Sequence, residues 1–196
     1  MISFNLSKDI IPYKIFLDMY MLAQRASQKN IEAACFSTCS DKKIPHSRFI
    51  NIKYINDNEI IFFSNYQSLK AQDIQSNNNV ALTFFWSSIN VQIRIQGIIS
   101  KLDDNRSNDH WKLRQNQKNI LSISSNQSSP IASYSKVKKK YEEFLNHDLS
   151  NRPNYWGGYV IIPNYFEIWQ GHESRINKRE VFELCDDNWK NFFLEP

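Results

Sequence analysis

The chain has 196 residues, of which 41% are hydrophobic and 22% charged, and its formal net charge is +4. These values are typical of a globular chain that buries a sizeable core, and they exclude a disordered or fibrous protein. Three cysteines without a C-x-x-C pair argue against a disulfide framework and a zinc site, so the expected compartment is a reducing cytoplasm. The N-terminal residues lack the basic start and long apolar run of a secretion signal, and no segment has the length of a membrane span. We therefore expect neither export nor insertion into a membrane.

Glycine is scarce, with four residues, and the chain contains neither G-x-G-x-x-G nor G-x-x-x-x-G-K-[ST]. The two commonest phosphate-binding loops of nucleotide proteins are therefore absent from the sequence. A phosphorylated ligand would have to be held by side chains and helix ends. The moderate positive charge suits an anionic small molecule or a weak nucleic-acid surface, and composition does not separate these two.

Residues 1–30 form an N-terminal helical segment, because apolar side chains recur at helical spacing over residues 12–28. The expected apolar face consists of Ile15, Met19, Leu22 and Ala26. Strand-like patterns then predict strands at 32–39, 46–54, 59–64, 80–86 and 90–100. A short helix capped by Ser68 is expected at 68–76.

Residues 103–146 are expected to be a helical insertion, with polar helices at 103–116 and 131–146 and a low-complexity loop at 122–129. Strands resume at 156–162, 165–170 and 180–185, and a last strand ends near Pro196. Because strands dominate, the predicted class is mainly β (α+β). The expected fold is a six-stranded antiparallel barrel with flanking helices, in a single domain of residues 1–196.

Six segments carry charged, aromatic and amide side chains in a characteristic order. They are HSRFINIK at 46–53, FFSNYQSLKAQDI at 62–74, VQIRIQG at 91–97, SNQSS at 125–129, YWGG at 155–158 and FEIWQGHESRINKR at 166–179. In order and spacing, from about residue 15 to the C-terminus, they resemble the pyridoxamine 5′-phosphate oxidase family. Any one of these segments alone is weak evidence for the family, whereas all six in this order are specific to it. The resemblance implies an FMN-binding split β-barrel, FMN as the cofactor, and a homodimer with FMN at the subunit interface.

The resemblance also implies which residues hold the flavin. One subunit would supply Arg48, Phe49, Ile50, Lys53, Phe63, Ser64 and Lys70, and the partner subunit would supply Gln92, Gln127, Ser128, Trp169 and Arg179. A phosphate dianion needs cationic groups, as Arg48 and Lys70 would provide, and Arg179 would stabilise negative charge on the reduced ring. Strand parity, however, predicts that Arg48 and Lys53 face opposite ways.

For the substrate, the resemblance implies a phosphate site and a pair of covering residues. The phosphate site would be Lys53, His110, Arg114 and Lys118, and the covering pair would be Arg175 and Asn177, with Arg175 as the catalytic residue nearest the reacting carbon. The chain departs from the family pattern at Leu69, His110, Lys118 and Asn177, where the family has Arg, Tyr, Ser and His. The implied activity is oxidation of pyridoxine 5′-phosphate or pyridoxamine 5′-phosphate to pyridoxal 5′-phosphate by O2.

Three alternatives stay open at this point. One is a related flavin oxidase of another anionic substrate, of the phenazine-biosynthesis type. Another is a non-catalytic split-barrel protein that binds flavin or haem. The third, nucleic-acid binding through the basic run at 135–140, is weak because its only aromatic neighbours are Tyr134 and Tyr141. We expect a small phosphorylated molecule as the ligand, and neither nucleic acid nor a membrane as a partner.

Overall fold

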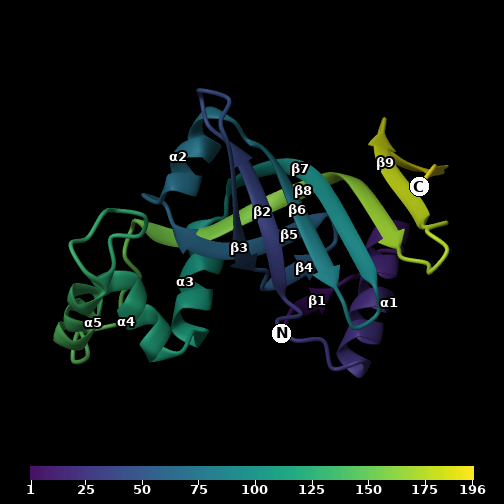
Figure 1. Ribbon diagram of the computed structural model, residues 1–196. Helices are drawn as coiled ribbons and strands as arrows, with labels where there is room; N and C mark the ends of the chain where they lie inside the picture. Colours follow the sequence, from purple (N-terminus) through teal and green to yellow (C-terminus); the bar gives the residue numbers. More distant parts are fainter.

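Figure 1 shows the computed structural model, which describes residues 1–196 and contains one strongly curved sheet with helices at two of its sides. The ten strands are β1 (Ser3–Asn5), β2 (Ala33–Cys39), β3 (Pro45–Asn51), β4 (Tyr54–Asn56), β5 (Glu59–Asn65), β6 (Asn79–Trp86), β7 (Val91–Lys101), β8 (Trp156–Gln170), β9 (Lys178–Cys185) and β10 (Asn188–Leu194). The helices are α1 (Ile11–Arg25), α2 (Leu69–Ser76), α3 (Asp104–Leu113), α4 (Asn116–Ser124) and α5 (Tyr134–Glu143).

The strands close into a barrel because β3 and β4 act as two halves of one bent strand. β3 pairs with β2, and β4 pairs with β5. Between them the backbone changes neighbours, since the Ile52 N–H donates to the Glu32 carbonyl and the Lys53 N–H donates to the Ile61 carbonyl. The antiparallel ring then runs from β5 through β8, β7 and β6 back to β2. With β3 and β4 counted as one strand, the predicted six-stranded barrel is confirmed.

Three strands of the sheet, β1, β9 and β10, lie outside the ring. β1 adds to β4 in parallel, and its three residues are too short for a hydrophobic pattern to reveal. β9 pairs with β8, and β10 pairs with β9, so this hairpin extends from the barrel. Figure 1 shows the hairpin and α1 on one side and α2 to α5 on the other.

The helix α1 was predicted at nearly its observed place, but the prediction of which face is buried was wrong. The side chains that pack into the barrel are those of Tyr13, Phe16, Tyr20 and Ala23, together with Pro12. Leu22, from the expected face, is 46% exposed. Aromatic rings remove more apolar surface from water than the aliphatic side chains beside them, and the helix turns so that Phe16 lies edge-on to Phe84 and Trp86.

The expected break between two strands at 162–165 is instead a bulge within the single long strand β8. Gly97 lies opposite Pro163, whereas Gln96 lies opposite Tyr165, so Asn164 is an extra residue on β8. A proline is tolerated in a strand at such a bulge, because the ladder is already interrupted there. Across the bulge, β7 shows the predicted alternation, with Val91, Ile93 and Ile95 buried.

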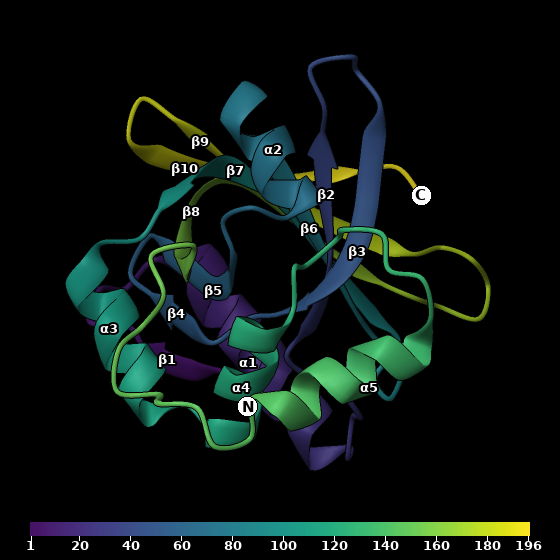
Figure 2. The same ribbon diagram turned by 90° about the vertical axis from the view of Figure 1, so that its left-hand side faces the viewer.

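The helical insertion contains three helices where two were expected. The additional helix is α4, which begins at Asn116, where the first predicted helix was expected to end. It extends to Ser124 and so covers the start of the loop predicted at 122–129, because Ile120 and Ser124 are buried on one face. The loop lies after Ser124 instead. Figure 2 faces this side of the molecule, where α3, α4 and α5 lie below α2 and β3. No helix of the chain combines the length and the apolar character needed to cross a membrane.

Candidate active site

A cleft of about 790 Å³ lies between β3, α2 and the helices of the insertion, a size typical of small-molecule sites. Positive charge dominates its lining. The basic lining residues are Arg48, Lys53, Lys70, Arg114 and Lys118, and no aspartate or glutamate lines the cleft. The chain therefore presents a concave, cationic surface suited to an anionic ligand.

Lys70 supplies a buried positive charge at one end of the cleft. It lies in the first turn of α2, is 6% exposed, and donates hydrogen bonds from Nζ to Ser64 Oγ at 3.0 Å and to Ser68 Oγ at 2.9 Å. Burial, and then the nearby charge of Arg48, lower the pKa of Lys70 to about 8. Both partners are neutral hydroxyls, so the charge of Lys70 is left for an anion to offset.

Ser68 occupies the N-cap position of α2, as predicted, but its hydroxyl does not cap the helix. Ser68 Oγ donates to the Asn65 carbonyl and accepts the bond from Lys70. The N-cap serine therefore orients the ammonium group instead of satisfying an amide of the helix. Leu69, the next residue, is 43% exposed and also lines the cleft.

The strand β3 presents an unpaired edge to the cleft. It pairs only with β2, and all of its residues, Pro45 to Asn51, line the cavity. Phe49 is 76% exposed. Unpaired N–H and C=O groups on a strand edge suit the polar rim of a planar ring. Lys53 lines the same cleft as Arg48, because the chain bends at the buried Ile52 and the strand parity is broken there.

The other end of the cleft is walled by stacked rings and bordered by cations. The His110 ring lies parallel to Phe63, and the Arg114 guanidinium lies over the ring of Trp156 at 4.9 Å. His110 Nδ1 is 2.9 Å from Tyr54 Oη. Burial lowers the pKa of His110 to about 4, with the charges of Arg114 and Lys53 adding to the effect. His110 is therefore neutral at pH 7, and the net positive charge comes from its Lys and Arg neighbours.

Arg114 is fixed in place by its own surroundings. Its Nη1 atom donates to the Asn119 side chain at 3.0 Å and to Ser122 Oγ at 2.9 Å. Burial lowers the pKa of Arg114 to about 10, so it stays charged at neutral pH. Lys118, at the start of α4, lines the cleft beside it. The structure thus brings together the four residues expected to bind a substrate phosphate.

Gln127 and Ser128 lie in the cleft of their own chain, although they were expected to reach a partner's site. Gln127 Oε1 is 3.4 Å from Ser64 Oγ, and both loop residues line the cavity. The extra turns of α4 carry the chain back toward β5, which places this loop beside Ser64. Within one chain, these residues therefore extend the surface formed by β5 and α2.

The remaining predicted residues form a separate group on the far side of the barrel. Gln92, Trp169 and Arg179 lie side by side in register on β7, β8 and β9. None of them lines the cleft, and Figure 1 shows β9 on the opposite side from α2. Arg179 Nε donates to the buried Glu167 carboxylate at 2.8 Å. One chain therefore does not bring Arg48, Lys70 and Arg179 together, because the barrel lies between them.

Arg175 and Asn177 lie in the turn between β8 and β9, also away from the cleft. Arg175 is exposed and has a positive φ of 63°. The Asn177 side chain accepts a hydrogen bond from the His172 N–H, so it stabilises the turn. Neither residue therefore contacts the cleft of its own chain.

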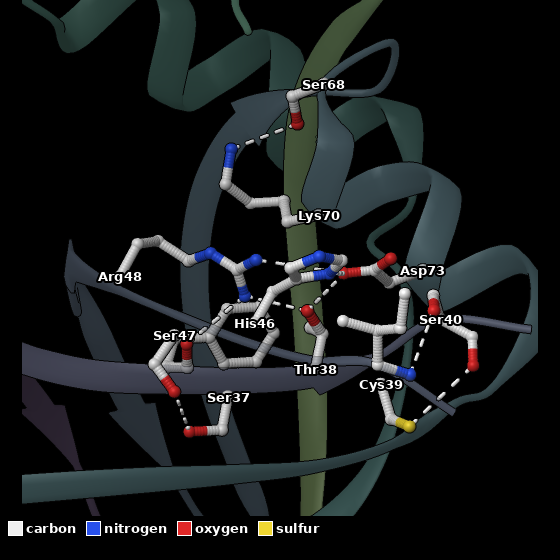
Figure 3. A network of polar contacts seen from close by, with 12 residues as sticks. Ser37, Thr38, Cys39, Ser40, His46, Ser47, Arg48, Ser68, Lys70 and Asp73 are labelled. Atoms are coloured by element: carbon white, nitrogen blue, oxygen red, sulfur yellow. Dashed lines mark hydrogen bonds and ion pairs between the residues drawn. The ribbon is translucent and has the colours of Figure 1, made fainter. Parts of the chain in front are cut away.

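Several residues near the cleft were missed by sequence reasoning. Trp156, which was not among the predicted site residues, forms part of the cleft wall, and His46 and Ser47 line it beside Arg48. Figure 3 shows that Thr38 contacts Arg48, that Asp73 contacts His46, and that Thr38 and Asp73 contact each other. Their positions in the sequence could have indicated two of them. His46 lies two residues before Arg48 and so on the same face of a strand, and Asp73 lies three residues after Lys70 and so on the same face of a helix.

Comparison with known proteins identifies two family regions in the chain. Residues 23–148 match the family described as pyridoxamine 5′-phosphate oxidase. Residues 156–196 match the pyridoxine 5′-phosphate oxidase C-terminal dimerisation region. The second region includes β8, β9 and β10, which carry Trp169 and Arg179.

Curated relatives match nearly the whole chain. A pyridoxine/pyridoxamine 5′-phosphate oxidase of Leptospira biflexa is 34% identical over 189 residues, which cover 94% of this chain and 89% of the relative. One from Rippkaea orientalis is 33% identical over 199 residues, with 98% and 94% covered.

Solved structures show the same fold at lower identity. PhzG from Burkholderia lata, solved with tetrahydrophenazine-1-carboxylic acid, has a TM-score of 0.88 at 23% identity, with 94% of this chain and 92% of PhzG covered. An FMN-binding protein from Nostoc punctiforme has a TM-score of 0.80 at 14% identity, with 96% and 100% covered.

Proposed function

The chain belongs to the pyridoxamine 5′-phosphate oxidase family, and from this membership we propose that it oxidises pyridoxine 5′-phosphate or pyridoxamine 5′-phosphate to pyridoxal 5′-phosphate, with O2 as the acceptor. The observation that carries the proposal is the cationic cleft with a buried, unneutralised Lys70 at one end and Lys53, Arg114 and Lys118 at the other. Two separated cationic regions suit a phosphorylated cofactor and a phosphorylated substrate in one cavity.

The chain is an FMN-dependent oxidoreductase, and its donor set fits FMN. Arg48, Lys70 and Ser64 would bind the phosphate, because they combine two cations with a hydroxyl at the start of a helix. The exposed edge of β3 from Phe49 to Asn51 would bind the rim of the ring. When bound, FMN supplies a two-electron acceptor that molecular oxygen can reoxidise.

The substrate residues act by orientation and charge. Lys53, Arg114 and Lys118 would hold the substrate phosphate, and the neutral His110 would add a hydrogen bond while its stacked ring walls the cavity. Arg175 would lie over the reacting carbon from the partner subunit. No side chain needs to act as a nucleophile in this scheme.

The proposed site is completed by a second copy of the chain. The match of residues 156–196 to a dimerisation region supports a homodimer. The row formed by Gln92, Trp169 and Arg179 would then face the cleft of the partner, with Arg179 steadying negative charge on the reduced ring. The buried Glu167 holds this guanidinium in place.

An absorbance experiment tests the proposal. The purified protein is expected to be yellow, and its flavin absorbance is expected to bleach when pyridoxine 5′-phosphate or pyridoxamine 5′-phosphate is added without oxygen. The bleaching step should form one pyridoxal 5′-phosphate per flavin, and admitting oxygen should restore the colour and form one hydrogen peroxide per flavin reoxidised. A protein that stays colourless after incubation with FMN would contradict both cofactor and reaction.

A related oxidase of another anionic substrate is the second candidate. His110, Lys118 and Asn177 depart from the side chains that the family resemblance leads us to expect, and all three departures fall on the substrate side. The anaerobic experiment separates the two candidates, because a yellow protein that is bleached by a reduced phenazine carboxylic acid, and not by the vitamin phosphates, would favour the second.

A further inference from the structure

Arg48 is held from behind by groups that do not line the cleft. Its Nη1 atom donates to Thr38 Oγ1 at 2.7 Å and to the Phe36 carbonyl at 3.2 Å. Its Nη2 atom lies 3.7 Å from Asp73 Oδ2. Figure 3 shows Arg48, Thr38 and Asp73 converging from β3, β2 and α2. Groups from β2 and α2 therefore fix the guanidinium group that Arg48 carries on β3.

Asp73 is the centre of this arrangement. The residue is 2% exposed, and its Oδ2 atom accepts a hydrogen bond from Thr38 Oγ1 at 2.5 Å and contacts His46 Nδ1 at 3.0 Å. A buried carboxylate is stable only where cations and donors surround it, as they do here. Asp73 does not line the cleft, so it approaches Arg48 from the side away from a ligand.

The same carboxylate contacts Arg48 and lies on the helix that carries Lys70, the second cation of the proposed phosphate site. Asp73 and Lys70 lie three residues apart on α2, whereas Arg48 lies on β3. Arg48 and Lys70 are close enough that the charge of Arg48 contributes to lowering the pKa of Lys70. The buried Lys70 and the half-buried Arg48 repel each other, and the negative charge of Asp73 beside Arg48 offsets that repulsion while the cleft-facing side stays free.

We propose that Asp73 is a positioning residue for the phosphate of FMN, acting through Arg48 and assisted by Thr38 and His46. The inference rests on the proposed function, because it takes Arg48 to be a phosphate ligand. Its physical content is preorganisation: a long, flexible guanidinium side chain is ordered before the ligand arrives, so less freedom is lost on binding. The negative charge of Asp73 also repels the phosphate. We expect this repulsion to weaken FMN binding less than the ordering of Arg48 strengthens it.

The test compares FMN with riboflavin, which lacks the phosphate. The purified full-length protein is freed of flavin, and dissociation constants for both ligands are measured by quenching of flavin fluorescence. Asp73→Asn is expected to weaken FMN binding about tenfold and to change riboflavin binding less than about twofold. Asp73→Glu should restore part of the loss. Asp57→Asn, which removes a hydrogen-bonded carboxylate on a turn outside the cleft, is the matched control.

A double-mutant cycle shows whether Asp73 acts through Arg48. In the Arg48→Ala background, Asp73→Asn is expected to cause no further loss of FMN affinity. Thr38→Val, which keeps the side-chain shape and removes the bridging hydroxyl, provides a second variant in case Asp73→Asn does not fold. It should also weaken FMN selectively.

Four results would overturn the inference. Equal weakening of FMN and riboflavin would show a merely structural role, and unchanged or tighter FMN binding would show that charge, not position, dominates. The same tenfold loss in the Arg48→Ala background would show that Asp73 acts by another route. A wild-type protein that binds neither flavin would overturn the proposed function as well, so the two failures are distinguishable.

Discussion

The ring of His110 stacks on the ring of Phe63, with 3.7 Å between the centroids and 7° between the planes. The stack joins α3 to β5 and keeps an imidazole out of water beside Arg114 and Lys53. This contact explains why a histidine in a cationic cleft stays neutral, and it makes His110 a hydrogen-bonding group and a wall of the cavity.

The stability of the flavin-free protein should fall in mild acid because of His110. Its pKa is about 4 in the folded chain and about 6.5 in the unfolded chain, so between these values only the unfolded chain binds the proton. The free energy of unfolding is therefore expected to fall as pH is lowered from 6.5 to 4, by at most about 1.4 kcal/mol per pH unit. His110→Tyr should flatten this slope in urea titrations, whereas His147→Tyr, on an exposed segment, should leave it unchanged.

FMN affinity should depend on pH through Lys70. The pKa of Lys70 is about 8 in the free protein, so above pH 8 the ammonium must regain a proton before it can bind the phosphate. Affinity is expected to fall by up to about tenfold per pH unit above pH 8 and to be nearly constant from pH 7 to 8. Lys70→Arg should remove the slope, because arginine stays protonated. A Lys70→Arg variant with the wild-type slope would contradict this assignment.

Mixed dimers should reveal whether each flavin site draws on both subunits. Lys70→Met and Arg179→Met are expected to weaken flavin binding in either homodimer at least tenfold. A dimer with one chain of each kind would contain one site with both changes and one intact site, so it should recover about half of the wild-type flavin content. If the two residues served the same chain's site, no intact site would form, and recovery would be absent.

Leu69→Arg should strengthen FMN binding. Leu69 lies beside Lys70 at the start of α2, is partly exposed and lines the cleft, so a guanidinium there would reach the proposed phosphate position. One added charge-assisted hydrogen bond corresponds to a gain of about tenfold. Leu145→Arg adds the same charge on an exposed residue outside the cleft and should leave FMN affinity unchanged. An equal gain in both variants would indicate a general charge effect.

Gly97→Ala should destabilise the barrel at its bulge. A Cβ atom at Gly97 would lie 2.4 Å from the Ile162 carbonyl oxygen and 2.9 Å from its carbon, and the backbone has little room to move. Such overpacking typically costs about 1–3 kcal/mol. A lower urea midpoint is expected for Gly97→Ala, whereas Ser100→Ala, at an exposed position of the same strand, should match the wild type. Equal midpoints would show that the bulge relaxes.

The barrel could be predicted from the sequence because it depends on local periodicity. The period-two pattern of β7 and the short helix after β5 appear in any window that contains them. The buried face of α1 could not be assigned this way. Both Ile15 and Phe16 fit a helical stripe, and only packing against Phe84 and Trp86 decides which of them is buried.

The cationic residues of the site were predicted from the family resemblance, which rests on six segments that contain Arg48, Lys53 and Lys70 but not Arg114 and Lys118. Their grouping was decided by tertiary structure. The bend at Ile52 puts Arg48 and Lys53 in one cleft against strand parity, and α4 returns Gln127 to Ser64 of its own chain. The place of Asp73 three residues after Lys70 could be read from the sequence, but its contacts to Thr38 and Arg48 could not, because these partners lie on β2 and β3. Spacing along a chain fixes which face a side chain takes within one element, whereas the distance between elements is set by how the barrel closes.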